Sequence, residues 1–190
     1  MMLATASLGE ACTVIMGQSP PGKSYNTSGD GLPFFQGKTD FGDTYPKIRV
    51  FCSLPSRIAE AGDILMSVRA PVGPTNLVKK RCCIGRGLAA LRTGARLDTT
   101  FLFYFLRHYE PRLASQGQGS TFDAVNRDAI EEIEIPLPPL AEQLRIAARL
   151  ALPSQRRPKN PCLRSSIMSE QAEWSYMKEV WVSSDPARML

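Results

Sequence analysis

Glycine and proline recur so often in the first 97 residues that long helices are excluded from this part of the chain. Fifteen of these residues fall between positions 17 and 74. Such spacing leaves room for short strands and turns. The best strand candidates are the apolar segments 33–36, 64–68 and 82–91. In the last segment, Gly85 and Gly87 predict a bulge or a close approach of two backbones.

The pattern becomes helical after Asp98, which is predicted to be an N-cap. Apolar residues at positions 101, 102, 105, 106 and 109 share one face of this helix, and Pro111 is expected to end or kink it. A polar loop is predicted over 116–121. The isoleucine spacing in 128–135 fits either a short helical turn or a strand. A second helix is predicted from Pro139.

These patterns predict a mixed α/β fold in three regions. Residues 1–138 form a β-rich domain, and residues 139–152 form a C-terminal helix. The apolar stripe of this helix consists of Leu140, Leu144, Ala147, Ala148 and Ala151. The tail 153–190 opens with a linker-like segment, and both disorder and one short helix over 169–182 are open for the rest.

The net charge of +5 is concentrated in the middle of the chain. Residues 47–112 hold 12 basic and 4 acidic residues, a local net charge of +8. Such an excess attracts polyanions such as nucleic acids. The alternative is an ordinary basic surface exposed to solvent.

The residue types needed for catalysis are sparse. The only histidine, His108, lies within the predicted aromatic helix and is expected to be a packed or half-exposed helix residue. Ser19 begins a Ser-Pro-Pro string like that of amino-group DNA methyltransferases, but Gly22 stands where those enzymes have an aromatic residue. Glu60 and Asp63 are interpreted as turn residues and not as metal ligands. No enzyme class is therefore indicated.

The five cysteines form no CxxC pair, which disfavours a zinc site and a disulfide framework. Reduced thiols and a cytoplasmic location are expected. The longest apolar run, near 101–106, is too short to cross a membrane, and the N-terminal residues do not resemble a secretory signal.

A DNA-binding surface is the remaining interpretation. Lysine and arginine neutralise phosphates, and arginine, asparagine and glutamine also contact base edges. The candidate residues are Lys47, Arg49, Arg69, Asn76, Lys79, Lys80, Arg81, Arg86, Gln116, Gln118 and Thr121. Gln36 and Asn126 lie in similar polar loops. Each polar candidate also has a simpler interpretation as a surface or turn residue.

Several strings, taken together, resemble the specificity subunits of Type I restriction–modification systems. The two most specific are GDILMSVRAPVG at 62–73 and IPLPPLAEQLRI at 135–146. Others are LGEACTVIMGQSPPGKSYN, LPFFQGKTDFG, CCIGRGLAAL and GQGSTFDAVNRDAI. The resemblance covers residues 8–150 in order and spacing.

This resemblance implies a target recognition domain that reads one half of a split sequence in double-stranded DNA. It also implies a non-catalytic subunit. Adenine methylation with S-adenosylmethionine would belong to a methyltransferase partner, and ATP- and magnesium-dependent cleavage to a restriction partner. No cofactor is expected in this chain.

The chain departs from the family pattern in length, because a full member has two recognition domains and long helices. The resemblance therefore implies a truncated, half-length subunit. Residues 139–152 would then bind the methyltransferase subunit or a second copy of the chain in a homodimer. The alternatives are that this stripe packs on its own domain, or that the chain binds the methyltransferase without binding DNA.

Overall fold

The computed structural model describes residues 4–117 and 124–151 and confirms the mixed α/β class. The strands are β1 (Thr5–Ser7), β2 (Cys12–Met16), β3 (Tyr25–Asn26), β4 (Leu32–Phe35), β5 (Val50–Cys52), β6 (Ile58–Ala59), β7 (Ile64–Ser67), β8 (Thr75–Leu77), β9 (Cys82–Ile84), β10 (Leu88–Thr93) and β11 (Glu134–Pro136). The helices are α1 (Leu8–Ala11), α2 (Thr99–Gly117), α3 (Arg127–Glu131) and α4 (Leu140–Leu150), with 3-10 turns η1 (Gly22–Ser24) and η2 (Lys38–Asp40).

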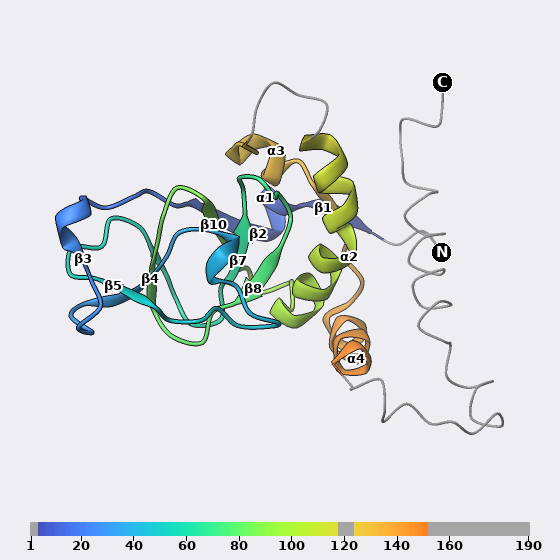
Figure 1. Ribbon diagram of the computed structural model, residues 1–190. Helices are drawn as coiled ribbons and strands as arrows, with labels where there is room; N and C mark the ends of the chain where they lie inside the picture. The colour runs from blue at the N-terminus through green and yellow to red at the C-terminus, as the bar shows by residue number, and fades with distance from the viewer. Residues whose placement is uncertain (1–3, 118–123, 152–190) are drawn as a thin grey trace.

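The strands form two main sheets. An antiparallel four-stranded sheet has the order β2-β10-β7-β8, and a five-stranded sheet has the order β3-β5-β4-β9-β6. In the second sheet β4 and β9 run parallel, whereas the other pairs are antiparallel. A small third sheet pairs β1 with β11. Figure 1 shows α2 on one side of the four-stranded sheet and β3, β4 and β5 at the opposite end of the domain.

Strand β7 lies in the middle of the core. Ile64 and Met66 belong to the cluster that packs against α2, whereas Leu65, on the other face, belongs to the cluster that includes residues of the five-stranded sheet. All three side chains are fully buried. A strand covered on both faces has a nearly continuous apolar sequence, which is why the segment 64–68, polar only at Ser67, is recognisable as a strand.

The predicted strand 82–91 is in fact two strands in different sheets. The turn between β9 and β10 approaches its neighbours so closely that only glycine fits there. A Cβ on Gly87 would lie 2.3 Å from the carbonyl oxygen of Gln36, and one on Gly17 would lie 2.1 Å from that of Gly85. The predicted close approach of backbones is confirmed, and the single continuous strand is wrong.

Helix α2 begins as predicted, because Asp98 Oδ1 accepts a hydrogen bond from the Phe101 amide at 2.8 Å. Pro111 does not end the helix, which continues to Gly117. The buried residues Leu106 and Leu113 hold the helix in the core on both sides of the proline. The prediction of a loop starting at position 116 is therefore wrong for its first two residues.

The ambiguous segment 128–135 contains both predicted elements, the end of α3 followed by β11. Ile130, Ile133 and Ile135 are all buried in the main core cluster. The sequence spacing changes from three to two because the chain changes from helix to strand between these side chains.

Helix α4 does not pack on the domain through the apolar stripe predicted as a partner contact. Its buried residues are Gln143, Ile146 and Ala147, of which the predicted stripe contains Ala147 alone. The other predicted members, Leu140, Leu144, Ala148 and Ala151, are exposed. The apolar spacing of α4 fits either a stripe that packs on the domain or a stripe left for a partner. The domain covers the face that contains Gln143, and most of the stripe is left exposed. The predicted tail elements, including the helix over 169–182, lie outside the described residues.

Candidate nucleic-acid interface

The β4–β5 loop, residues 36–49, is folded back on itself by hydrogen bonds. The Asp40 carboxylate accepts from the Gln36 amide at 2.7 Å, and the Asp40 carbonyl accepts from the Lys47 amide at 2.7 Å. Gly42 donates to the carbonyl of Tyr45 at 3.2 Å. These bonds close both ends of the loop, so its tip has a defined conformation.

Asn76 of β8 anchors this loop to the four-stranded sheet. Its Nδ2 donates to the Gly42 carbonyl at 3.0 Å, and its Oδ1 accepts from the Gly42 amide at 3.0 Å. The Leu77 amide also donates to the Thr44 carbonyl at 2.7 Å. Asn76 is only 1% exposed. The prediction that Asn76 faces DNA is wrong, because its amide is buried and already bonded.

This anchoring brings together basic residues that are distant in sequence. Lys79 follows β8, and its Nζ lies 3.9 Å from the centroid of the Tyr45 ring in the loop. Lys47 and Arg49 are exposed on the same loop, and Arg49 donates to the Thr39 carbonyl at 2.7 Å. The structure thus joins three of the predicted cations on one loop and the turn beside it.

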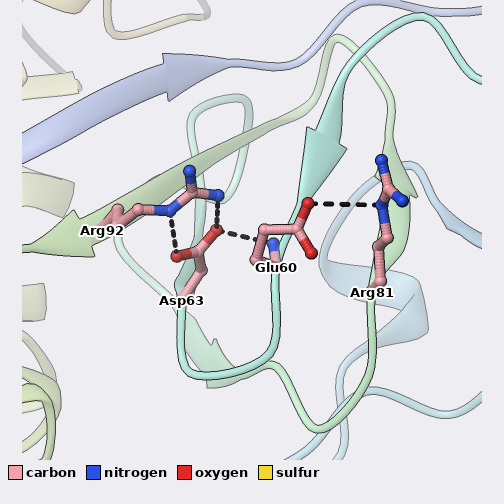
Figure 2. A network of polar contacts seen from close by, with 4 residues as sticks. All are labelled: Glu60, Asp63, Arg81 and Arg92. Carbon is pink, nitrogen blue, oxygen red and sulfur yellow. Dashed lines mark hydrogen bonds and ion pairs between the residues drawn. The ribbon is translucent and has the colours of Figure 1, made fainter.

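The next two cations of the β8–β9 turn differ in their surroundings. Arg81 Nε lies 3.2 Å from Glu60 Oε1, as Figure 2 shows. Lys80 is exposed and makes no ion pair within the described part of the chain. Lys80 can approach a phosphate without breaking a contact, whereas Arg81 must first leave its carboxylate.

Arg86 occupies a separate position at the turn between β9 and β10. It is exposed between the two close-packed glycines, and Gln36 lies against this turn. Gln18 is also exposed, and its amide donates to the Ile84 carbonyl at 3.1 Å. Reasoning from the sequence misses Gln18, although the adjacent Gly17 is a signal of a close backbone approach.

The remaining predicted contacts are scattered or outside the described residues. Arg69 is exposed after β7, where its backbone forms an isolated bridge with Ala124. Gln116 is helical, and nothing is described of its side chain, while Gln118 and Thr121 fall in the gap between 117 and 124. Asn126 caps α3 by accepting from the Ala129 amide at 2.9 Å.

The residues considered for catalysis in the sequence analysis belong to a turn and to a helix. Asp63 accepts from the Glu60 amide at 2.8 Å, as expected of turn residues. His108 is exposed on α2, so it is a helix residue as expected, but the expectation that it is packed or half-exposed is wrong. Among residues 4–117 and 124–151, no three His, Cys, Asp or Glu side chains are grouped to hold a metal ion. No helix in these ranges is long and apolar enough to span a membrane.

Helix α4 is fixed to the domain by the buried apolar residues Ile146 and Ala147 and by one polar side chain. Gln143 is fully buried, and it accepts from the Asp98 amide at 2.8 Å and donates to the carbonyls of Arg96 and Pro138 at 2.9 and 2.8 Å. Beside this buried face, Leu140 and Leu144 are exposed to solvent. The helix therefore has one docked face and one apolar face available to a partner.

Residues 3–151 match the family described as the Type I restriction modification DNA specificity domain. A similar curated protein is the MjaX type I restriction enzyme specificity subunit of Methanocaldococcus jannaschii, which is 46% identical over 138 residues. The alignment covers 72% of this chain and 32% of that protein, so the chain spans about a third of this relative's length.

Solved structures give the same relationship. The HsdS subunit of Thermoanaerobacter tengcongensis is 51% identical with a TM-score of 0.71, over 77% of this chain and 36% of that chain. A chain from a structure that concerns the assembly of the type I R-M system is 45% identical, with a TM-score of 0.74. The match covers 93% of this chain and 42% of that chain. The M. genitalium S subunit, 19% identical with a TM-score of 0.62, shares the fold. This protein belongs to the Type I restriction modification DNA specificity domain family.

Proposed function

We propose that this chain is the DNA-recognition unit of a Type I-like restriction–modification system and reads one half of a split duplex sequence. The observation that carries the proposal is the joining of Lys47, Arg49 and Lys79 by the contact between the β4–β5 loop and β8. Exposed cations on a preformed surface neutralise phosphates and release counterions. The family match supports recognition, and not catalysis, as the role of the chain.

The chemistry would be supplied by partner subunits. A methyltransferase subunit would transfer the methyl group from S-adenosylmethionine to adenine, and a restriction subunit using ATP and magnesium would join through the complex. One similar solved structure concerns the assembly of such a system, which supports this partnership. The role also carries the prediction of a cytoplasmic location, where the DNA lies.

The exposed face of α4 is the proposed contact with the methyltransferase subunit or with a second copy of this chain. Leu140 and Leu144 form an apolar pair one helical turn apart, and Ala148 extends it by another turn. A homodimer would present two recognition domains and favour a symmetric split site. Sedimentation of the full chain, alone and with the methyltransferase subunit, distinguishes the two partners.

Salt-dependent duplex binding tests the DNA role. The full chain is titrated into a labelled random duplex at several salt concentrations, and the slope of log affinity against log salt is measured. Replacing Lys79, Lys80 and Arg81 together by alanine should flatten this slope by about 0.9 for each phosphate that is no longer neutralised. A matched triple variant of Lys23, Arg96 and Arg127, which lie outside the proposed surface, should retain more of the slope. Equal slopes for the two variants contradict the assignment of the surface.

The second candidate function is a protein-interaction fragment that binds the methyltransferase subunit without binding DNA. The exposed Leu140 and Leu144 favour it, because apolar helix faces of this kind are suited to protein contacts. Copurification with the methyltransferase subunit, combined with no shift of any duplex by the chain or the complex, would establish this candidate in place of the first.

A further inference from the structure

Two large apolar side chains of the β4–β5 loop are exposed among cations. Tyr45 is 41% and Ile48 is 51% exposed, and Ile48 stands between the exposed residues Lys47 and Arg49. A single exposed apolar side chain needs no explanation by itself, so the inference rests on the setting of Ile48, which is a preformed loop with cations on both sides of this side chain. The hydrogen bonds that hold the loop do not involve the Ile48 side chain, because they are made by the backbone and by the side chains of Asp40, Arg49, Asn76 and Arg107.

The loop also holds these side chains in place before any partner binds. The Tyr45 carbonyl accepts from Gly42, the Thr44 carbonyl accepts from Leu77, and the Tyr45 ring lies beneath the ammonium group of Lys79. The Lys47 amide donates to the Asp40 carbonyl directly before Ile48. Fixing the loop in advance lowers the conformational entropy cost of binding.

The charge around Ile48 identifies the kind of partner. Lysine is depleted at protein–protein interfaces, whereas here Lys47 directly precedes the apolar side chain and Lys79 lies over the Tyr45 ring of the same loop. In complexes with DNA, cations contact phosphates while an apolar side chain contacts a thymine methyl group or is inserted between bases. A duplex therefore fits the pattern better than a protein surface.

We propose that Ile48 enters a groove of the duplex and contacts base edges, while Lys47, Arg49 and Lys79 hold the flanking phosphates. This inference rests on the proposed DNA role and adds to it a residue that supplies sequence preference without charge. Tyr45 positions the loop by packing under Lys79. A wholly apolar side chain distinguishes Ile48 from the cations and amides in the predicted DNA-binding set.

The test separates apolar from ionic contacts. The full chain first selects duplexes from a random library. The affinities of Ile48→Ser, of Lys47→Ala and of the matched control Leu54→Ser are then measured for selected and for unselected duplexes. Leu54 is 58% exposed and has the uncharged neighbours Ser53 and Pro55. Ile48→Ser should weaken binding to selected duplexes about tenfold at an unchanged salt slope. Lys47→Ala should lower the slope by about 0.9.

Photocrosslinking gives a second measurement that does not depend on affinity. Benzoylphenylalanine placed at position 48 should crosslink to the bases of a selected duplex, whereas the same group at position 54 should not. The inference is overturned if Ile48→Ser binds like Leu54→Ser, or if position 48 crosslinks only to the methyltransferase subunit. If the unaltered chain binds no duplex at all, both the proposed DNA role and the inference about Ile48 fail.

Discussion

Asp63 and Arg92 form an ion pair with two hydrogen bonds. Arg92 Nε lies 2.9 Å from Asp63 Oδ1, and Nη2 lies 2.8 Å from Oδ2. Figure 2 shows that the same carboxylate also accepts a hydrogen bond from the Glu60 amide, and that the Glu60 side chain forms an ion pair with Arg81. The Asp63 side chain is 3% exposed, and its hydrogen bonds raise the pKa of Arg92. The pair therefore links the turn before β7 to β10.

Replacing Asp63 by alanine should lower the free energy of unfolding by about 1–3 kcal/mol, because the Glu60 amide would lose its acceptor and the half-exposed Arg92 would lose two hydrogen bonds. Urea denaturation measures the change. Glu60→Gln is the control, and its exposed ion pair should contribute less than about 1 kcal/mol. If both substitutions lower the free energy of unfolding equally, the burial of Asp63 does not increase the contribution of its ion pair to stability.

Removing the Glu60 carboxylate should strengthen DNA binding, because Arg81 is released to contact phosphate. The slope of log affinity against log salt should become steeper in Glu60→Gln by up to about 0.9. In contrast, Lys80→Ala should make the slope shallower by a similar amount. Fluorescence anisotropy with one duplex at several salt concentrations measures both changes. A Glu60→Gln chain with an unchanged slope would mean that Arg81 stays away from the DNA.

Replacing Gln143 by leucine should destabilise the domain by about 2–4 kcal/mol, since one amide and two carbonyls would be left without their partner. Leu144→Ser, one residue further on and 51% exposed, should change stability by less than about 0.5 kcal/mol. Thermal and urea unfolding of both variants provide the comparison. The opposite order would mean that the exposed face of α4 is the one that packs on the domain.

The cysteine thiols of the core should be unreactive in the folded chain. Burial raises the pKa of Cys12 and Cys82 to about 12 and that of Cys83 to about 11. Because these values lie above the ordinary 9.0, the thiols stay protonated at pH 8 and favour folding, an effect that disappears as pH rises from 9 toward 12. In a Cys162→Ser chain, Ellman's reagent should react slowly before denaturation and rapidly afterwards. Fast reaction in the native state would contradict the buried positions.

The sequence is sufficient to predict elements whose signals are local. The capping role of Asp98 depends on residues three positions apart, and the first three residues of the buried strand β7 are consecutive apolar residues. The end of α2 is not predictable in this way. Proline at position 111 removes one helical hydrogen bond, but contacts of Leu106 and Leu113 with distant strands preserve the helix.

The candidate site is predictable in composition but not in arrangement. The sequence indicates which segment is basic, yet Asn76 has the same residue type whether it contacts DNA or anchors a loop. Its partner, Gly42, lies 34 residues away, and only the folded chain shows the contact. Similarly, the exposure of Ile48 depends on where the β4–β5 loop leaves the sheet. The local sequence does not determine that position.

Selection of duplexes from a random library by the full 190-residue chain tests the central claim most directly. We expect that a short sequence is enriched, and that changing one of its base pairs weakens binding by about 1–3 kcal/mol at fixed salt. Affinity for selected and random duplexes should fall linearly on a log–log salt plot. Equal affinity for selected and random duplexes at every salt concentration would contradict the claim that this chain recognises sequence.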